Sequence, residues 1–309
     1  MRANRAERVI FVFLDGVGLG SADPDENPLA ARLLPSFARL AGGQPWTQGA
    51  EAVRQPGHVF LPIDATLGVP GLPQSGTGQA TLFTGVNCAR LAGRHWGPFP
   101  HSTSKPVIAS ENLFVRLRQR GRSGLFANAF PERFFRMVAP RDRWTVTTRC
   151  CVEAEVKLLD EHDLRAGEAL PADLTGAAWP ERLGISVPII SPQESGKRLA
   201  RLARTADVTL FEYFLTDKAG HARDAEWAGR LLQDLDEFFL GLLADLDPAS
   251  DLLVVSSDHG NLENVASRVH TMNPVPLVAL GAGAERLGAC RDLADVTPAI
   301  VAAMAGTAG

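Results

Sequence analysis

Four mostly apolar runs recur along the chain, and two of them lie near its opposite ends. They are Val9–Leu14, Val208–Phe214, Leu252–Val255 and a shorter run at Val275–Leu280. Apolar runs without clear alternation are typical of strands that are buried on both faces of a sheet. The pattern therefore predicts a strand at each of these positions.

Helical patterns separate and follow these runs. They cover Glu194–Ala206, Ala225–Leu246 and Leu293–Met304. The second is the strongest, because its apolar residues recur every three or four positions, as an amphipathic helix requires. These residues are Trp227, Leu231, Leu235, Phe238, Leu242 and Leu246. Strands that alternate with helices predict an α/β fold with a doubly wound, mostly parallel sheet covered on both faces.

The middle of the chain breaks this alternation. It is rich in Arg, Pro, Gly and Trp, with β-branched residues at Arg143–Val156 and a short helical pattern at Pro131–Met137. We therefore expect residues 93–188 to form a smaller α+β cap domain. This domain would be inserted into a discontinuous α/β core made of residues 1–92 and 189–309.

Composition narrows the function classes. The chain has 309 residues and a net charge of -4, so no overall attraction to nucleic acid or to a membrane surface is expected. No apolar stretch reaches the roughly 18 residues that span a bilayer. The first apolar run ends at Asp15 rather than at a small-residue cleavage site, which favours a strand over a signal peptide. The four cysteines lack metal-binding spacing, which predicts reduced thiols in a cytoplasmic protein. The sequence does not indicate an oligomeric state.

Carboxylate and imidazole side chains lie in short segments beside these apolar runs. Taken singly, each has an ordinary explanation as a turn residue, a helix cap or a satisfied polar group. Together they predict a centre for two divalent ions, Mn²⁺ or Zn²⁺, because the carboxyl ends of parallel strands meet at one edge of a sheet. The candidate ligands are Asp15, Asp217, His221, Asp258, His259 and His270.

A glycine-rich segment, Ser75-Gly76-Thr77-Gly78, precedes a short apolar helix. Ser75 at the N-terminus of that helix would lie where backbone N–H groups and the helix dipole favour an anion. Its hydroxyl becomes a nucleophile when a base or a metal lowers its pKa, and two nearby ions would do so. The alternatives are a helix cap in a glycine-rich turn, or Thr77 as the reactive hydroxyl.

Five segments, in this order and spacing, resemble the alkaline phosphatase superfamily. They are LDGVG, QSGTGQATLFTG, DKAGH, SSDHGNLEN and HTMNPVP. The likeness is closest to the metalloenzyme branch with cofactor-independent phosphoglycerate mutase and phosphopentomutase, and it covers about residues 8–90 and 188–305.

This resemblance implies a role for each candidate residue. One metal would be held by Asp217, His221 and His270. The other would be held by Asp15, Asp258 and His259. Ser75 would be both a ligand and the nucleophile that forms a phosphoserine, and its position nine residues before Thr84 matches the family's nucleophile.

The chain also departs from relatives in this superfamily. It lacks the mutase's HGGVHS-like motif and its Asp-Gly-Arg-Asp segment, and its middle part is closer in size to that of phosphopentomutase. Ser75 is followed by Gly-Thr-Gly-Gln rather than by the x-Pro-x-Arg of sulfatases, so sulfatase chemistry is not expected.

The expected function is therefore two-metal phosphoryl transfer on a phosphorylated small molecule, in the manner of a phosphomutase. The alternatives are a phosphomonoesterase or phosphodiesterase, or a non-catalytic binding protein stabilised by metal. Arg94 and His95, shortly after the nucleophile helix, are predicted to bind a phosphate or sugar oxygen of the substrate. The alternative for that segment is a solvated hinge with a buried Trp.

Overall fold

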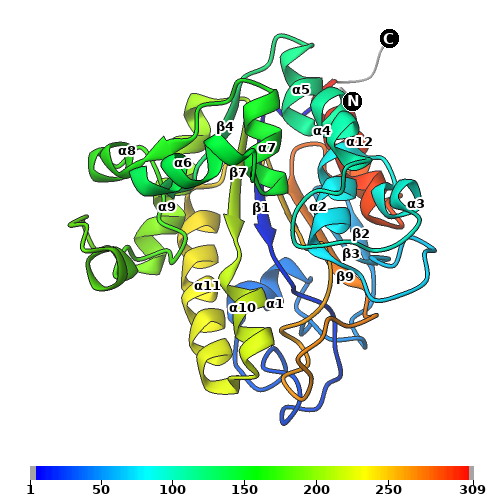
Figure 1. Cartoon of the computed structure of the whole chain (residues 1–309). Helices are drawn as coiled ribbons and strands as arrows, with labels where there is room; N and C mark the ends of the chain where they lie inside the picture. Colours follow the sequence, from blue (N-terminus) through cyan, green and yellow to red (C-terminus); the bar gives the residue numbers. More distant parts are fainter. Residues whose placement is uncertain (1–4, 306–309) are drawn as a thin grey trace.

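A seven-stranded sheet forms the centre of the computed structural model, which describes residues 5–305 (Figure 1). The strands are β1 (Arg8–Leu14), β2 (Val53–Gln55), β3 (His58–Ile63), β4 (Gly124–Phe126), β5 (Ala129–Phe130), β6 (Leu159–Asp160), β7 (Val208–Tyr213), β8 (Asp251–Ser256) and β9 (Val275–Gly281). The sheet order is β2-β3-β9-β8-β1-β7-β4, while β5 and β6 pair separately. Strands β8, β1, β7 and β4 are parallel neighbours, which confirms the mostly parallel sheet, whereas β9 pairs antiparallel with both β8 and β3.

Helices cover both faces of this sheet. They are α1 (Pro35–Leu40), α2 (Ser75–Thr84), α3 (Cys88–Ala92), α4 (Ser104–Glu111), α5 (Leu113–Arg118), α6 (Glu132–Val138), α7 (Val146–Glu153), α8 (Glu161–Ala166), α9 (Pro192–Leu202), α10 (Leu215–Ala222), α11 (Ala225–Asp245) and α12 (Val296–Ala305). Side chains alternate along β1: Phe11 and Phe13 enter the core with α2, α4, α5, α7 and α12, while Ile10 and Val12 enter the core with α1, α9 and α11. This two-sided burial explains the continuous apolar runs. Among residues 5–305, no helix is long and apolar enough to cross a membrane.

Helices α9 and α11 pack closely because a glycine lies at their contact. A β-carbon at Gly241 would lie only 2.0 Å from the backbone carbonyl oxygen of Gln193 on α9. We expect Gly241→Ala to lower the free energy of unfolding by about 1–3 kcal/mol, because the two backbones must separate. Gly229→Ala on the same helix is the matched control. Its β-carbon would meet the flexible side chain of exposed Arg32, so no loss is expected. Urea denaturation measures both, and equal effects would contradict this packing account.

The β-branched residues of Arg143–Val156 do not form a strand, because this segment contains helix α7. The Thr145 side chain accepts a hydrogen bond from the backbone N–H of Thr148 and so caps the helix. Val146 and Cys150, four positions apart, are buried on its inner face. Tertiary burial of this face and the cap therefore outweigh the β propensity of the threonines and valines. The short helix predicted at Pro131–Met137 is confirmed as α6.

The predicted boundaries of an inserted cap domain stay a prediction. Within residues 93–188, strand β4 pairs with β7 in the main sheet. Buried residues of α4, α5 and α7 also belong to the main core, because they cover one face of that sheet. A separate small apolar cluster lies further along, where Leu159, Leu164 and Trp179 pack together beside β5 and β6.

Candidate metal and phosphoryl-transfer site

The six predicted metal ligands and Ser75 lie together at the carboxyl edge of the parallel strands. Asp15 directly follows β1, while α10 carries Asp217 and His221 after β7. The remaining residues come from three further segments. Asp258 and His259 follow β8, His270 lies in the loop before β9, and Ser75 begins α2. This edge is where open α/β sheets build their sites.

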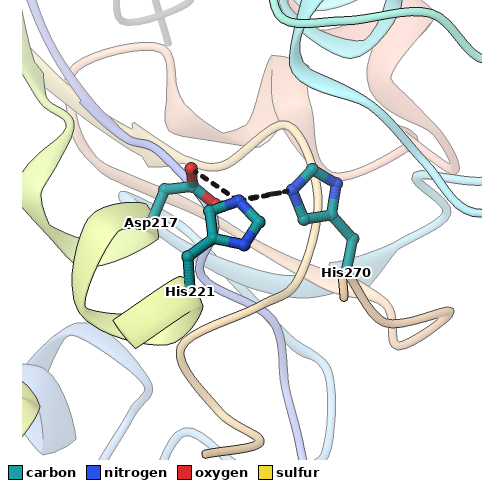
Figure 2. Close-up of side chains that lie close together, drawn as sticks. All are labelled: Asp217, His221 and His270. Carbon is teal, nitrogen blue, oxygen red and sulfur yellow. Dashed lines mark hydrogen bonds and ion pairs between the residues drawn. The ribbon is translucent and has the colours of Figure 1, made fainter. Parts of the chain in front are cut away.

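Asp217, His221 and His270 form the first group, and they point toward a common centre (Figure 2). The Nε2 atom of His221 lies 3.2 Å from Nε2 of His270 and 3.3 Å from Oδ2 of Asp217. Nε2 of His270 lies 3.6 Å from Oδ1 of Asp217. Ligands at about 2.0–2.1 Å around a tetrahedral ion are themselves about 3.3 Å apart, so these separations fit a shared divalent cation.

Backbone carbonyls fix the orientation of both imidazoles in this group. Nδ1 of His221 lies 2.9 Å from the carbonyl oxygen of Arg268, and Nδ1 of His270 lies 2.7 Å from that of Pro73. Because a carbonyl only accepts, each Nδ1 carries the proton and each Nε2 keeps its lone pair. This arrangement is typical of histidines that bind a metal through Nε2.

The second group centres on His259, which is fully buried. Its Nε2 lies 3.0 Å from Oγ of Ser75, 3.5 Å from Oδ1 of Asp15 and 3.4 Å from Oδ2 of Asp258. Within the described residues, those same two carboxylate oxygens are buried without a hydrogen-bond partner. Buried carboxylates normally have a partner, so a cation between them fits this donor set.

Asp217 lies between the two groups. Its carboxylate is close to His221 and His270 and also to Asp15 and His259. The family pattern implied that Asp217 serves one ion only, whereas its position in the structure allows it to contact both.

The site favours uncharged side chains when no cation is present. Burial, followed by the charge of Asp258, raises the pKa of Asp15 well above its ordinary value. Burial and then the charge of Asp217 raise the pKa of Asp258 to about 8. Burial also lowers the pKa of His259 and His270, so their imidazoles are neutral, as metal binding requires. A divalent cation bound here would instead favour the ionised forms of the Asp15 and Asp258 carboxyl groups.

The raised pKa of Asp258 predicts how the metal-free protein responds to pH. The folded state retains a proton that the unfolded chain releases above pH 3.8, so the free energy of unfolding falls as pH rises from there to about 8. One such group contributes a slope of up to about 1.4 kcal/mol per pH unit. In urea denaturation with chelator, we expect Asp258→Asn to reduce the slope of unfolding free energy against pH. Part of the slope should remain, because the pKa of Asp15 is also raised. An unchanged slope in the variant would contradict this origin.

Ser75 is the first residue of α2, at the positive end of the helix dipole. The turn that presents it is tightly packed, because a β-carbon at Gly76 would lie 2.2 Å from the carbonyl oxygen of Phe99. Thr77 is fully buried and its hydroxyl exchanges hydrogen bonds with the backbone of Trp96. Of the two hydroxyls, only that of Ser75 therefore faces the metal residues.

Three supporting residues were missed by sequence reasoning. Gln79, one turn after Ser75, donates to Oδ2 of Asp15 at 3.3 Å. Asn261 donates to Oδ1 of Asp217 at 2.7 Å. The carboxylate of Glu263 accepts from the backbone N–H groups of residues 18 and 261 and from the side chain of residue 271, so it ties the loop after β1 to the connection between β8 and β9. Their only sequence signal is proximity to predicted ligands.

Neither Arg94 nor His95 lines the cavity that adjoins Ser75 and Asp217. The guanidinium of Arg94 lies 4.7 Å from the centre of the Trp96 ring. Nε2 of His95 lies 3.1 Å from the carbonyl oxygen of Val69. Their role in substrate binding stays a prediction, and Trp96, predicted in the alternative to be buried, is exposed.

Residues 187–307 match the family model described as the metalloenzyme superfamily. A 2,3-bisphosphoglycerate-independent phosphoglycerate mutase from Roseobacter denitrificans is 27% identical over 150 residues, which are 45% of this chain and 30% of that protein. A second, from Yersinia pestis, is 30% identical over 105 residues, which are 32% of this chain and 20% of that protein. The matched part thus spans less than a third of these relatives. These matches confirm the predicted resemblance.

Solved structures share the fold across nearly the whole chain. The PH0037 protein from Pyrococcus horikoshii has a TM-score of 0.60 at 12% identity, covering 97% of this chain and 98% of that one. The alkaline phosphatase of Thermus thermophilus has a TM-score of 0.54 at 14% identity, covering 98% and 92%. The phosphoglycerate mutase of Leishmania mexicana has a TM-score of 0.53 at 11% identity, covering 100% and 98%. The chain therefore has an alkaline phosphatase-like fold.

Proposed function

We propose that this chain, whose residues 187–307 match the metalloenzyme superfamily, transfers phosphoryl groups of a small-molecule phosphate ester through a phosphoserine at Ser75. The observation that carries the proposal is the position of the Ser75 hydroxyl, 3.0 Å from Nε2 of His259 and beside two buried carboxylate oxygens without a partner. Mutases and phosphatases among the similar proteins support the same reaction class.

The donor set fits two divalent ions. Asp217, His221 and His270 would hold one, and Asp15, Asp258, His259 and Ser75 would hold the other, with Asp217 close enough to contact both. Zn²⁺ and Mn²⁺ both suit carboxylate and imidazole ligands. Bound there, such ions would lower the pKa of the serine hydroxyl and neutralise charge on the phosphoryl group.

The protein's own residues define the transfer. Ser75 Oγ attacks phosphorus, the Oγ–P bond forms as the P–O bond to the alcohol breaks, and the serine proton ends on the alcohol oxygen. The positive end of the α2 dipole, where Ser75 lies, would face the transferred group. Gln79 holds the Asp15 carboxylate in place during this step. Water, or a second hydroxyl of the substrate, then takes the phosphoryl group and restores Ser75.

The group that accepts the phosphoryl group from Ser75 distinguishes a phosphomutase from a hydrolase. The sequence relatives favour the mutase, and the fold is shared with alkaline phosphatases. The experiment is to load the protein with Mn²⁺ or Zn²⁺ and to supply p-nitrophenyl phosphate, its diester, and sugar phosphates. Isomerised sugar phosphate supports a mutase, whereas released phosphate without isomer supports a hydrolase. Metal binding without turnover of any ester would favour the non-catalytic binding protein instead.

A further inference from the structure

A cavity of about 560 Å³ adjoins the candidate site, and none of the reaction steps above uses most of it. Asp15, Ser75 and Asp217 line one end, so the cavity begins where the phosphoryl group would sit. The rest extends over residues of α6 and of the turn Trp179–Leu183. Its volume is in the range of pockets that hold small organic ligands.

Apolar side chains dominate the lining away from Ser75. They are Phe130, Phe134, Met137, Trp179, Leu183 and Phe214. The rings of Phe130 and Phe134 are stacked, with centroids 4.4 Å apart and planes at 24°. Met137 is 60% exposed, and no residue of α6 is buried, although the helix carries two phenylalanines and a methionine. Such an apolar wall is stabilised when an apolar group covers it.

Beyond the candidate ligands, the cavity carries one acidic and two basic side chains, and burial raises the pKa of the acid, Glu212, to about 7. Glu212 is buried and accepts a hydrogen bond of 2.7 Å from Thr147. Two cations, Arg133 and Lys218, also line the cavity, and Lys218 Nζ lies 4.5 Å from the centre of the Phe214 ring. Arg133 is exposed to solvent, where an ion pair contributes little. A carboxylate placed deep in the cavity would lose hydration among the aromatic rings, and this costs free energy.

We infer that the substrate is a phosphate monoester whose alcohol part is apolar and about the size of a fused-ring aromatic group. The phosphoryl group lies at Ser75, and the apolar part lies between α6, Trp179 and Phe214. This inference rests on the proposed function, and the bonds that form and break are those given above. Small, strongly acidic esters such as phosphoglycerate leave this wall uncovered and are poor substrates.

Binding and turnover are measured on metal-loaded protein with two matched series. The first series compares the binding of 1-naphthylmethylphosphonate with that of methylphosphonate. Neither compound can transfer a phosphoryl group. The second compares 1-naphthylmethyl phosphate with glycerol 3-phosphate and 3-phosphoglycerate, all esters of alkyl alcohols, so that leaving-group basicity does not dominate. Burying the aromatic group is expected to favour the naphthyl compound by about tenfold or more in Kd and in kcat/KM.

Two neighbouring phenylalanines on α6 provide a matched pair of variants. Phe134 lines the cavity, whereas Phe135 does not. Phe134→Ala should remove most of the naphthyl preference and leave methylphosphonate affinity within about threefold. Phe135→Ala should keep the preference. Met137→Glu is a further test at an exposed position, so it should not affect folding, and it should also lower the preference.

The outcomes separate the two proposals. Turnover and phosphoserine formation with no naphthyl preference, or with the preference unchanged in Phe134→Ala, would overturn the apolar substrate class and leave the proposed function standing. A naphthyl preference in binding without turnover of any ester would overturn the proposed function. A preference in both series that is lost in Phe134→Ala supports both.

Discussion

Replacing Ser75 by Ala is expected to lower kcat by about a thousandfold or more, because the attacking oxygen is removed while the rest of the site remains. Ser75 is the hydroxyl that lies against His259, and it begins α2 without capping it through its side chain. The substitution should therefore leave the thermal unfolding temperature of the metal-free protein nearly unchanged. Steady-state turnover of a phosphate ester, measured beside a thermal scan, tests both expectations.

Thr77→Val is the matched control for this prediction. It removes the other hydroxyl of the segment and keeps its shape, but it leaves the backbone N–H of Trp96 without its acceptor. A buried donor without a partner costs about 1–3 kcal/mol, so stability should fall while the rate constant of phosphoryl transfer is largely kept. Loss of activity in Thr77→Val with full activity in Ser75→Ala would assign the attack to Thr77.

Replacing Asp217 by Ala is expected to weaken binding of both metal ions, because its carboxylate lies in both candidate groups. Loss of residues that only support metal ligands costs about 10–100-fold in affinity, so loss of this carboxylate should cost more than about a hundredfold. Activity at limiting metal should fall with it. Titration calorimetry and metal content after gel filtration measure the effect.

Two further variants are controls for the metal affinity of Asp217→Ala. Asp245→Ala removes a carboxylate at the far end of α11 and should not change metal content. Asn261→Ala removes the hydrogen bonds that its amide donates to Oδ1 of Asp217, at 2.7 Å, and to the backbone carbonyl oxygen of Asp217, at 3.1 Å, and it should have an intermediate effect. Loss of a single ion in Asp217→Ala, with the second retained at full affinity, would contradict a position between two ions.

Much of the core was predictable because burial leaves a local signal. Strands β7 and β8 are buried throughout and β1 is buried from its second residue on, so these strands contain apolar runs that end near the candidate ligands. The antiparallel direction of β9 leaves no such signal, since a strand buried among neighbours is apolar in either direction. For the same reason α7 was not predicted, because its cap and its buried face can be recognised only once the helix packs against the core.

The sequence predicted which candidate ligands lie together, but not the residues that surround them. Asp15, Asp258 and His259 lie within a few residues of strand ends, and this position can be read from sequence. The hydrogen bonds of Gln79, Asn261 and Glu263 depend on loops that meet only in the folded chain. The apolar cavity also joins segments far apart in sequence, and no periodic pattern marks it.

The most direct test of the central claim is to locate the phosphoryl group on the protein. Metal-loaded protein is mixed with a phosphate ester, quenched in acid and digested, and the peptides are analysed by tandem mass spectrometry. The proposed function predicts one phosphoryl group on Ser75, which is absent when metal is removed by chelator. Turnover that proceeds with no phosphoryl group on Ser75, or with the group on another residue, would contradict it.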